Sequence, residues 1–287
     1  MTKVLIFGLH YHGRAVYRSL NKSLYKIVGF IDNDVKKSGE LFGDINIHHT
    51  SDLSLINFDK IIIAGRNIDE MVSQLINDFH LSKEKIIIMN RSDIAIKGKD
   101  LEHRESVLCN MLFHFTNLVN EREIDYWVTK SSLLALKRGE KFAKFSDVDI
   151  VIMSSKVPLF LNILEELQCS YNIEINRQII DSKYWKKGDV SSVKISEKAD
   201  YVAVEPALID ITILNKFSNN IYIRTLHNTI TVLPTHFFDG NDTIKRYNIN
   251  FSVPKNSEEY LRFVYGKEWR IPTEQWQHKN YKSIKRK

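Results

Sequence analysis

The stretch KVLIFGLHYHGR (residues 3–14) decides the fold of the first part of the chain. Its short apolar run ends at Gly8, and a helical pattern begins at Gly13. A strand, a glycine turn and a helix in this order bring backbone N–H groups and a helix N-terminus together, where a phosphate can bind. The sequence therefore indicates a candidate nucleotide-binding turn, with Gly8, Gly13 and Arg14 beside the ligand.

The centre of this turn departs from the dinucleotide-binding pattern G-x-G-x-x-G. His10 stands in place of the middle glycine, which lets a pyrophosphate approach the backbone closely. About 20 residues further on, Asp32 or Asp34 could be the acidic residue that binds a ribose hydroxyl, and we take Asp32 as the candidate. A scaffold or dimerisation domain that binds no ligand stays open as the alternative.

Outward from the turn, apolar runs alternate with helical patterns. This alternation is typical of βαβ units with a parallel sheet. The further apolar runs are residues 27–31, 60–64 and 85–89. We predict an α/β domain over residues 1–92, a polar and charged boundary, and a second domain over residues 105–287.

The first domain resembles a known small domain in three of its motifs, GLHYHGR (8–14), VGFIDND (28–34) and Ala64-Gly65. They are similar to the Rossmann-like N-terminal domain of sugar O-acyltransferases of the sialic-acid and bacillosamine type. The resemblance covers about residues 1–90 and implies a contribution to nucleotide-sugar binding.

The composition excludes several classes of protein. With 43% hydrophobic and 26% charged residues among 287, the chain is neither disordered nor fibrous. No apolar stretch is long enough to span a bilayer, and basic and aromatic residues do not interleave as they do on nucleic-acid platforms. The net charge of +6 suits an anionic substrate. We expect a cytoplasmic protein with at most peripheral contact at the inner face of the membrane, and a homo-oligomer stays open.

Two carboxylates introduce an apolar run in the second domain, DVDIVIM (147–153). Alternate side chains of a strand share a face, so Asp147 and Asp149 are expected side by side. They repel each other unless one is protonated or a divalent cation binds. A third carboxylate, Asp210, lies in the apolar run LIDITI (208–213). If the two strands are neighbours, the three carboxylates converge on Mg²⁺ or Mn²⁺. The alternative is that Asp147 and Asp149 only cap the end of a strand.

Two serines precede the carboxylates at the start of a short helical stretch. Hydroxyl and amide groups at a helix start can bind phosphate, and an arginine can bind it through a bidentate fork. The order Ser-Ser, Asp-x-Asp, Asp is similar to that of the nucleotidyltransferase superfamily, which has Gly-Gly or Gly-Ser at the first position. The candidate phosphate-binding residues are Ser131, Ser132, Lys137 and Arg138.

A closer resemblance comes from YWVTKSSLLALKR (126–138), DVDI (147–150) and the closing pattern from Pro254 to Pro272. Together they resemble the LicD family over about residues 105–275. The resemblance implies a nucleotidyltransferase-like α+β fold with a mixed sheet. It also implies metal-dependent transfer of a phospho-alcohol from a CDP-linked donor to a hydroxyl of a cell-surface glycan or its precursor. The transferred group is phosphocholine in bacterial members and phosphoribitol in the fukutin-related ones, and phosphoglycerol is a further candidate.

Three departures from the LicD pattern leave the donor open. Ser131 and Ala135 replace family glycines, and Gly139 stands where a histidine often follows the arginine. Two alternatives remain beside the LicD hypothesis. One is a nucleotidyltransferase that uses an NTP to modify a small molecule or a protein. The other is an inactive module that only binds a nucleotide-sugar.

Overall fold

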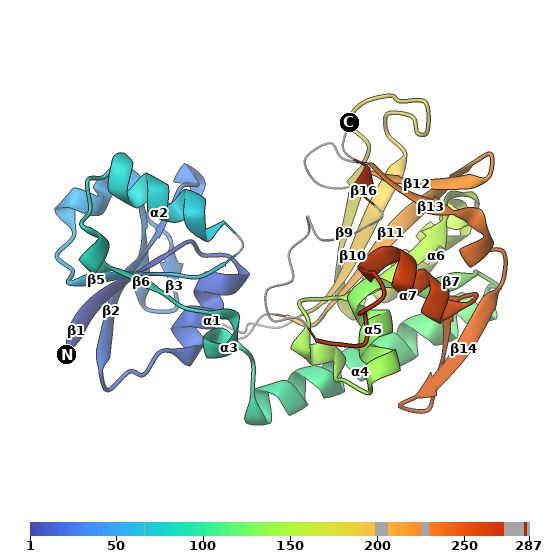
Figure 1. Cartoon of the computed structure of the whole chain (residues 1–287), viewed down its shortest axis with the longest axis horizontal. Coiled ribbons are helices and arrows are strands. Elements are labelled where there is room, and N and C mark those ends of the chain that lie inside the picture. The colour runs from blue at the N-terminus through green and yellow to red at the C-terminus, as the bar shows by residue number, and fades with distance from the viewer. Residues whose placement is uncertain (66, 199–205, 225–229, 273–283, 286–287) are drawn as a thin grey trace. The chain divides into compact units, whose positions relative to one another are not determined.

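The computed structural model of the chain describes residues 1–65, 67–198, 206–224, 230–272 and 284–285 (Figure 1). These residues form two compact units, which divide between Lys97 and Gly98. The first unit contains a six-stranded sheet and the second contains an eight-stranded sheet and a separate hairpin. The predicted fold class, an N-terminal parallel α/β domain followed by a domain with a mixed sheet, is confirmed.

The sheet of the first unit has the strand order β3-β4-β2-β1-β5-β6 and is parallel except where β3 pairs with β4. Its strands are β1 (Thr2–Phe7), β2 (Tyr25–Asp32), β3 (Leu41–Phe42), β4 (Ile45–His49), β5 (Lys60–Ile63) and β6 (Ile86–Ile88). The helices are α1 (Tyr11–Ser19), α2 (Ile68–Asn77) and α3 (Arg91–Ile94), with 3₁₀ turns η1 (Val35–Lys37), η2 (Thr50–Leu55) and η3 (Lys83–Lys85).

Both faces of this sheet are covered, which explains why its strands are almost entirely apolar. Val4 and Ile6 of β1 point to the face that packs on α1 and α3. Leu5 and Phe7 alternate with them and pack on the other face, where Leu75 of α2 lies. The Gly8 turn follows the carboxyl end of β1, at the edge where ligands of parallel sheets bind.

The second unit has a mixed sheet in which β8 is parallel to β11 and its other strand pairs are antiparallel among the described residues. Its strands are β7 (Tyr126–Val128), β8 (Val148–Met153), β9 (Tyr171–Arg177), β10 (Val190–Glu197), β11 (Leu208–Phe217), β12 (Asn220–Arg224), β13 (Ile230–Pro234) and β16 (Ile284–Lys285). The separate hairpin is β14 (Asn241–Arg246) with β15 (Ile249–Pro254).

The helices of the second unit are α4 (Gly98–Glu121), α5 (Lys130–Arg138), α6 (Val157–Leu167) and α7 (Ser257–Tyr265), with 3₁₀ turns η4 (Phe142–Lys144), η5 (Ser154–Lys156) and η7 (Thr235–Phe237). Leu108, Met111, Leu112 and Phe115 form the apolar stripe of α4, at the spacing of a helix that faces a core. These side chains join those of α6 and the sheet in one hydrophobic core.

The predicted boundary differs from the structure in one respect. The polar and charged residues before 105 were assigned to the boundary between the domains, and α4 of the second unit already begins at Gly98. Arg104 and Glu105 are buried in this helix, because their charged groups bind the backbone of a loop in the same unit. The two charged side chains thus make tertiary contacts and do not indicate a linker.

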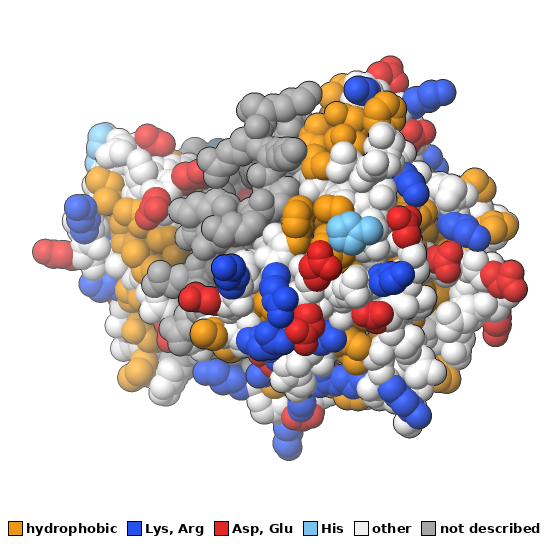
Figure 2. All heavy atoms as spheres, turned by 45° about the vertical axis from the view of Figure 1, so that its right-hand side comes forward, with side chains coloured by type: hydrophobic (Ala, Val, Ile, Leu, Met, Phe, Trp, Pro, Cys, Tyr) orange, Lys and Arg blue, Asp and Glu red, His pale blue; other side chains and the backbone are white. Residues whose placement is uncertain are grey.

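The surface carries both signs of charge. On the face shown in Figure 2, lysine and arginine side chains lie among acidic ones over the second unit. Across the described parts of the chain, helices are too short or too polar to cross a membrane. Cys109 and Cys169 are both free thiols.

Candidate active site

Asp149 and Asp210 lie side by side on neighbouring strands. Strands β8 and β11 run parallel, and Asp149 is the register partner of Asp210. Ile150 and Ile211, the next pair, point to the opposite face and are buried in the core. The condition on which the convergence of the carboxylates depended, that the two strands are neighbours, is therefore met.

Asp147 joins this pair from the bend directly before β8. Burial raises the pKa of Asp147 to about 6, and the negative charges of Asp149 and Asp210 add to the rise. The hydroxyl of Ser146 donates a hydrogen bond of 2.8 Å to Asp147 Oδ1 and opposes it. Burial also raises the pKa of Asp210. The charge of Asp149 thus disfavours the ionisation of both Asp147 and Asp210, so the three carboxylates lie close enough to interact.

A lysine that the sequence patterns did not single out belongs to the same cluster. Lys130 Nζ lies 3.0 Å from Asp149 Oδ1, and its charge partly opposes the rise in the pKa of Asp147 and of Asp210. Lys130 is the first residue of α5 and has a φ of +46°, the left-handed region. A side chain in this region costs about 1 kcal/mol or more, so the backbone here is strained. The only signal in the sequence was its place directly before the two serines.

Ser131 and Ser132 also bind Asp149. The hydroxyl of Ser131 donates to Asp149 Oδ2 at 2.7 Å, and the amide of Asp149 donates to Ser132 Oγ at 2.8 Å. Ser132 is completely buried, and its hydroxyl holds α5 against β8. Ser131 lies beside the carboxylates, and the phosphate contacts of both serines stay a prediction.

Lys137 and Arg138 lie at the opposite end of α5 from these contacts. Eight residues along an α-helix correspond to about 12 Å. The guanidinium of Arg138 donates to the carbonyl oxygens of Trp269 and Ile271, and Lys137 is exposed. Both residues are therefore outside the carboxylate cluster, because α5 turns its N-terminal end toward β8 and its C-terminal end toward the segment after α7.

Charged side chains continue across the sheet beyond Asp210. Lys194 of β10 is the register partner of Asp210, and Glu174 of β9 is the partner of Lys194. Lys194 Nζ lies 3.6 Å from Glu174 Oε1. Acidic and basic groups thus alternate on the strands that lead away from the cluster, and Lys194 is the next cation after Lys130.

The loop that leads to Asp147 is held by two buried residues of α4. Arg104 donates to the carbonyl oxygens of Ala143, Phe145 and Ser146 at 2.6–3.2 Å. Glu105 accepts hydrogen bonds from the amides of Phe142 and Ala143 and from the hydroxyl of Tyr247. The position of the Asp147 backbone therefore depends on α4.

The candidate residues of the first unit are engaged within that unit. Gly8 has a φ of +86°, and a Cβ on Gly13 would lie 1.7 Å from the Gly8 carbonyl oxygen, so both glycines are needed for the turn. Arg14 lies over the ring of Phe42. The buried Asp32 accepts from the amide of Leu9 at 2.9 Å and from Lys37 Nζ at 2.9 Å.

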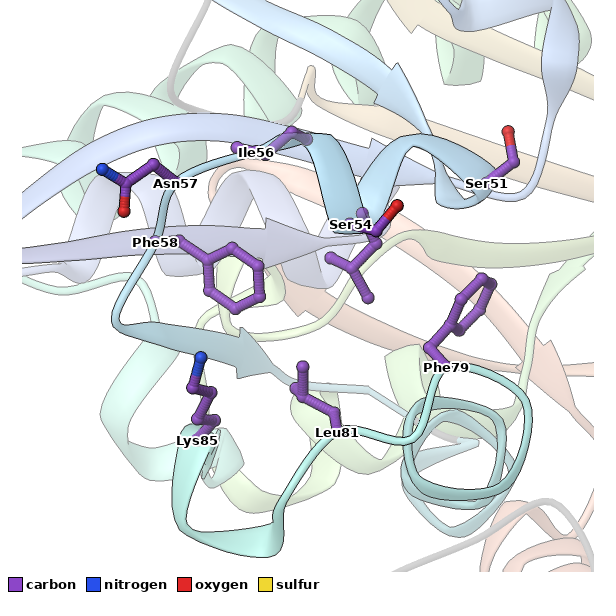
Figure 3. Close-up of a pocket in the computed structure, with 9 residues that line it drawn as sticks. Ser51, Ser54, Ile56, Asn57, Phe58, Phe79, Leu81 and Lys85 are labelled. Carbon is purple, nitrogen blue, oxygen red and sulfur yellow. The ribbon is translucent and has the colours of Figure 1, made fainter.

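Asp32 therefore closes the glycine turn, and its carboxylate is already in use where a ribose contact was expected. Burial works against its ionisation, but the hydrogen bonds from the Leu9 and Asp34 amides and from Lys37 outweigh burial and lower the pKa of Asp32. A hollow of about 320 Å³ lies elsewhere in this unit, between Phe58, Phe79, Leu81 and Lys85 (Figure 3). Phe58 and Lys85 precede β5 and β6, so the hollow is at the amino ends of the strands, away from the turn.

One pH-dependent effect is expected from Asp147. Its folded-state pKa of about 6 lies above the unfolded value of about 3.9, so the folded protein binds this proton more tightly. The contribution of the Asp147 carboxyl to the free energy of unfolding is fully present below about pH 4 and is lost as the pH rises through about 6. In metal-free protein, Asp147→Asn should gain about 1–3 kcal/mol relative to wild type between about pH 4.5 and pH 8. Urea unfolding of both proteins at the two pH values measures this gain. A stability difference between Asp147→Asn and wild type that does not change with pH would contradict the prediction.

Within the described ranges, no three histidine, cysteine or acidic side chains are already arranged as the ligands of one metal ion. Asp149 instead has both carboxylate oxygens bonded to the start of α5, one to Lys130 and one to Ser131. Any metal ion at this cluster would compete with those two contacts.

One family model matches the first unit. Residues 1–87 match the family described as C2185-like, N-terminal. No curated protein matches the chain.

Among solved structures, the lincosamide antibiotic adenylyltransferase LnuA with bound lincomycin is 16% identical, and the match covers 53% of this chain and 82% of that one with a TM-score of 0.35. The putative oxidoreductase yvaA from Bacillus subtilis is 12% identical over 92% of this chain and 87% of its own, with a TM-score of 0.24. UDP-N-acetylglucosamine 3-dehydrogenase GnnA from Acidithiobacillus ferrooxidans is 10% identical over 88% and 82%, with a TM-score of 0.23. At these TM-scores none of the three likenesses carries an argument about function.

Proposed function

We propose that the second unit catalyses metal-dependent transfer of a phospho-alcohol from a CDP-linked donor to a hydroxyl of a cell-surface glycan or its precursor. One observation carries the proposal: Asp149 and Asp210 are register partners on parallel strands, with Asp147 beside them. The LicD resemblance of residues 105–275 supplies the donor and acceptor classes. We place the reaction in the cytoplasm, with at most peripheral contact at the inner face of the membrane.

The donor set fits Mg²⁺ or Mn²⁺. Both ions prefer oxygen ligands, and carboxylates that share a site with phosphate oxygens are their usual protein ligands. The three carboxylates, with one ammonium from Lys130, leave an excess of two negative charges when all are ionised. A divalent cation would remove this excess. When bound, it would polarise the diphosphate and stabilise the charge on the departing CMP.

The three carboxylates and Ser131 have separate proposed roles. Asp147 and Asp149 would hold the cation. Asp210 would bind a second cation or take the proton of the acceptor hydroxyl, for which a raised pKa is suited. The acceptor oxygen forms its bond to the β-phosphorus as the bond from phosphorus to CMP breaks in line. Ser131, whose hydroxyl already lies at Asp149, is the residue of α5 placed to meet a phosphate oxygen.

A donor screen tests this proposal. The full-length protein is incubated with CDP-choline, CDP-ribitol, CDP-glycerol or CDP-ethanolamine, with Mg²⁺ or Mn²⁺ and with EDTA, and CMP release and donor binding are measured. We expect metal-dependent CMP release with one of the four. No release and no binding with any donor would overturn the assignment. Pyrophosphate release from an NTP in the same assay would favour nucleotidyl transfer instead.

A further inference from the structure

The ammonium of Lys130 is the nearest cation to the three carboxylates in the part of the chain that the structure describes. It lies 3.0 Å from Asp149 Oδ1, while the hydroxyl of Ser131 donates to Asp149 Oδ2 at 2.7 Å. Asp149 is 7% exposed, so its carboxylate oxygens meet these two partners and little solvent. Asp149 is thus fully engaged by the protein itself on the side where a metal ligand is needed.

The backbone at Lys130 directs its side chain to this place. Thr129 is extended and ends the approach from β7, and Lys130 then takes the left-handed conformation with a φ of +46° before α5 continues. Glycine adopts this conformation without strain, whereas lysine does not. Backbone strain of this kind clusters at functional sites of proteins. The lysine here brings its ammonium to the carboxylates, which a glycine could not do.

We infer that Lys130 is an intramolecular competitor of the divalent cation: its ammonium neutralises Asp149 in the metal-free protein and must leave before a metal ion can use that carboxylate. This inference rests on the proposed function only in taking the carboxylates as metal ligands. Lys130 thereby sets the concentration of divalent cation at which the site fills, because a ligand in competition binds with lower apparent affinity.

The side chain of Lys130 is able to leave. It is 33% exposed, compared with 10% for the side chain of Asp149, so its outer part already meets solvent. A lysine ammonium sits on a flexible four-carbon stem and is well hydrated in water. Rotation about the side-chain bonds frees Asp149 Oδ1 without a change in β8 or α5. An arginine or a buried lysine would be a less readily displaced competitor.

Binding of Mn²⁺ alone to the metal-free, full-length protein tests the inference, with free Mn²⁺ measured by electron paramagnetic resonance. Lys130→Met should lower the Mn²⁺ dissociation constant by about tenfold or more, because it removes a half-buried competing charge. Lys130→Gly should do the same and suits the left-handed backbone, so it serves if the methionine variant folds poorly. Thermal melting checks the fold of each variant.

Lys194→Met is the matched control. It removes the same charge from β10, where Lys194 is the register partner of Asp210 but lies two strands and about 10 Å from Asp149, the carboxylate that Lys130 occupies. Its effect should be no more than about threefold. Equal effects of the two methionine variants, weaker Mn²⁺ binding by Lys130→Met, or no Mn²⁺ binding by any variant would overturn the inference. Tighter binding by Lys130→Met without CMP release from any CDP-linked donor would instead leave it standing and remove only the proposed function.

Discussion

Asp149→Asn should lower metal-dependent CMP release by about 10³-fold, which corresponds to about 4 kcal/mol of activation free energy. Asparagine keeps the size of the side chain but loses the charge that holds a divalent cation. Asp149 is also the residue that Lys130, Ser131 and Ser132 all contact, so no neighbouring carboxylate can take its position. Steady-state rates at saturating Mg²⁺ measure the loss.

Asp239→Asn serves as the control for this substitution. Asp239 is exposed in the same unit, where it pairs loosely with Lys216 at 3.4 Å. Its replacement should leave the rate within about twofold, since exposed ion pairs contribute little. If Asp149→Asn kept more than a tenth of the wild-type rate while remaining folded, the carboxylate cluster would not be the reaction centre.

Arg104→Met should lower the free energy of unfolding of the second unit by about 3–4 kcal/mol. Arg104 is only 3% exposed, and its guanidinium donates to three carbonyl oxygens of the loop before Asp147. Methionine fills much of the same volume but leaves these buried acceptors without their donor. Urea unfolding followed by tryptophan fluorescence reports this unit alone, because all four tryptophans come after residue 98.

Arg122→Met is the comparison for this stability measurement. Arg122 follows the end of α4 and pairs with Glu166 at the surface, with both side chains partly exposed. Its loss should cost less than about 1 kcal/mol. Equal destabilisation by the two substitutions would show that the contacts of Arg104 with the loop add nothing specific.

The sequence predicted the sheets better than the contacts around the candidate site. Apolar runs broken by glycine or aspartate mark β1, β5, β8 and β11, because strands buried in a sheet leave little freedom in residue type. The same patterns identified Asp149 and Asp210 as charges in apolar strands. That the two are register partners could only be conjectured, since the pairing of strands distant in sequence leaves no local mark.

The contacts around the candidate site were not predictable, as three residues of α5 show: Lys130, Ser132 and Arg138. The role of Lys130 depends on one positive φ, and a lysine residue does not favour that conformation. Ser132 is buried because α5 packs on β8, and its hydroxyl accepts a hydrogen bond from the amide of Asp149 that the local pattern does not indicate. Arg138 donates hydrogen bonds to carbonyl oxygens of a segment that lies more than a hundred residues away in the sequence. Each outcome follows from tertiary packing and not from the local pattern.

The early start of α4 decides where the protein can be divided by recombination. A gene segment that begins at residue 105, where sequence patterns placed the second domain, would encode Glu105 but omit Arg104 and the first turns of the helix. The encoded polypeptide would then present Ala143, Phe145 and Ser146 without their donor. A crossover at Gly98 or before it keeps helix and loop together, so inheritance or exchange of the second unit as a module is expected to respect that position.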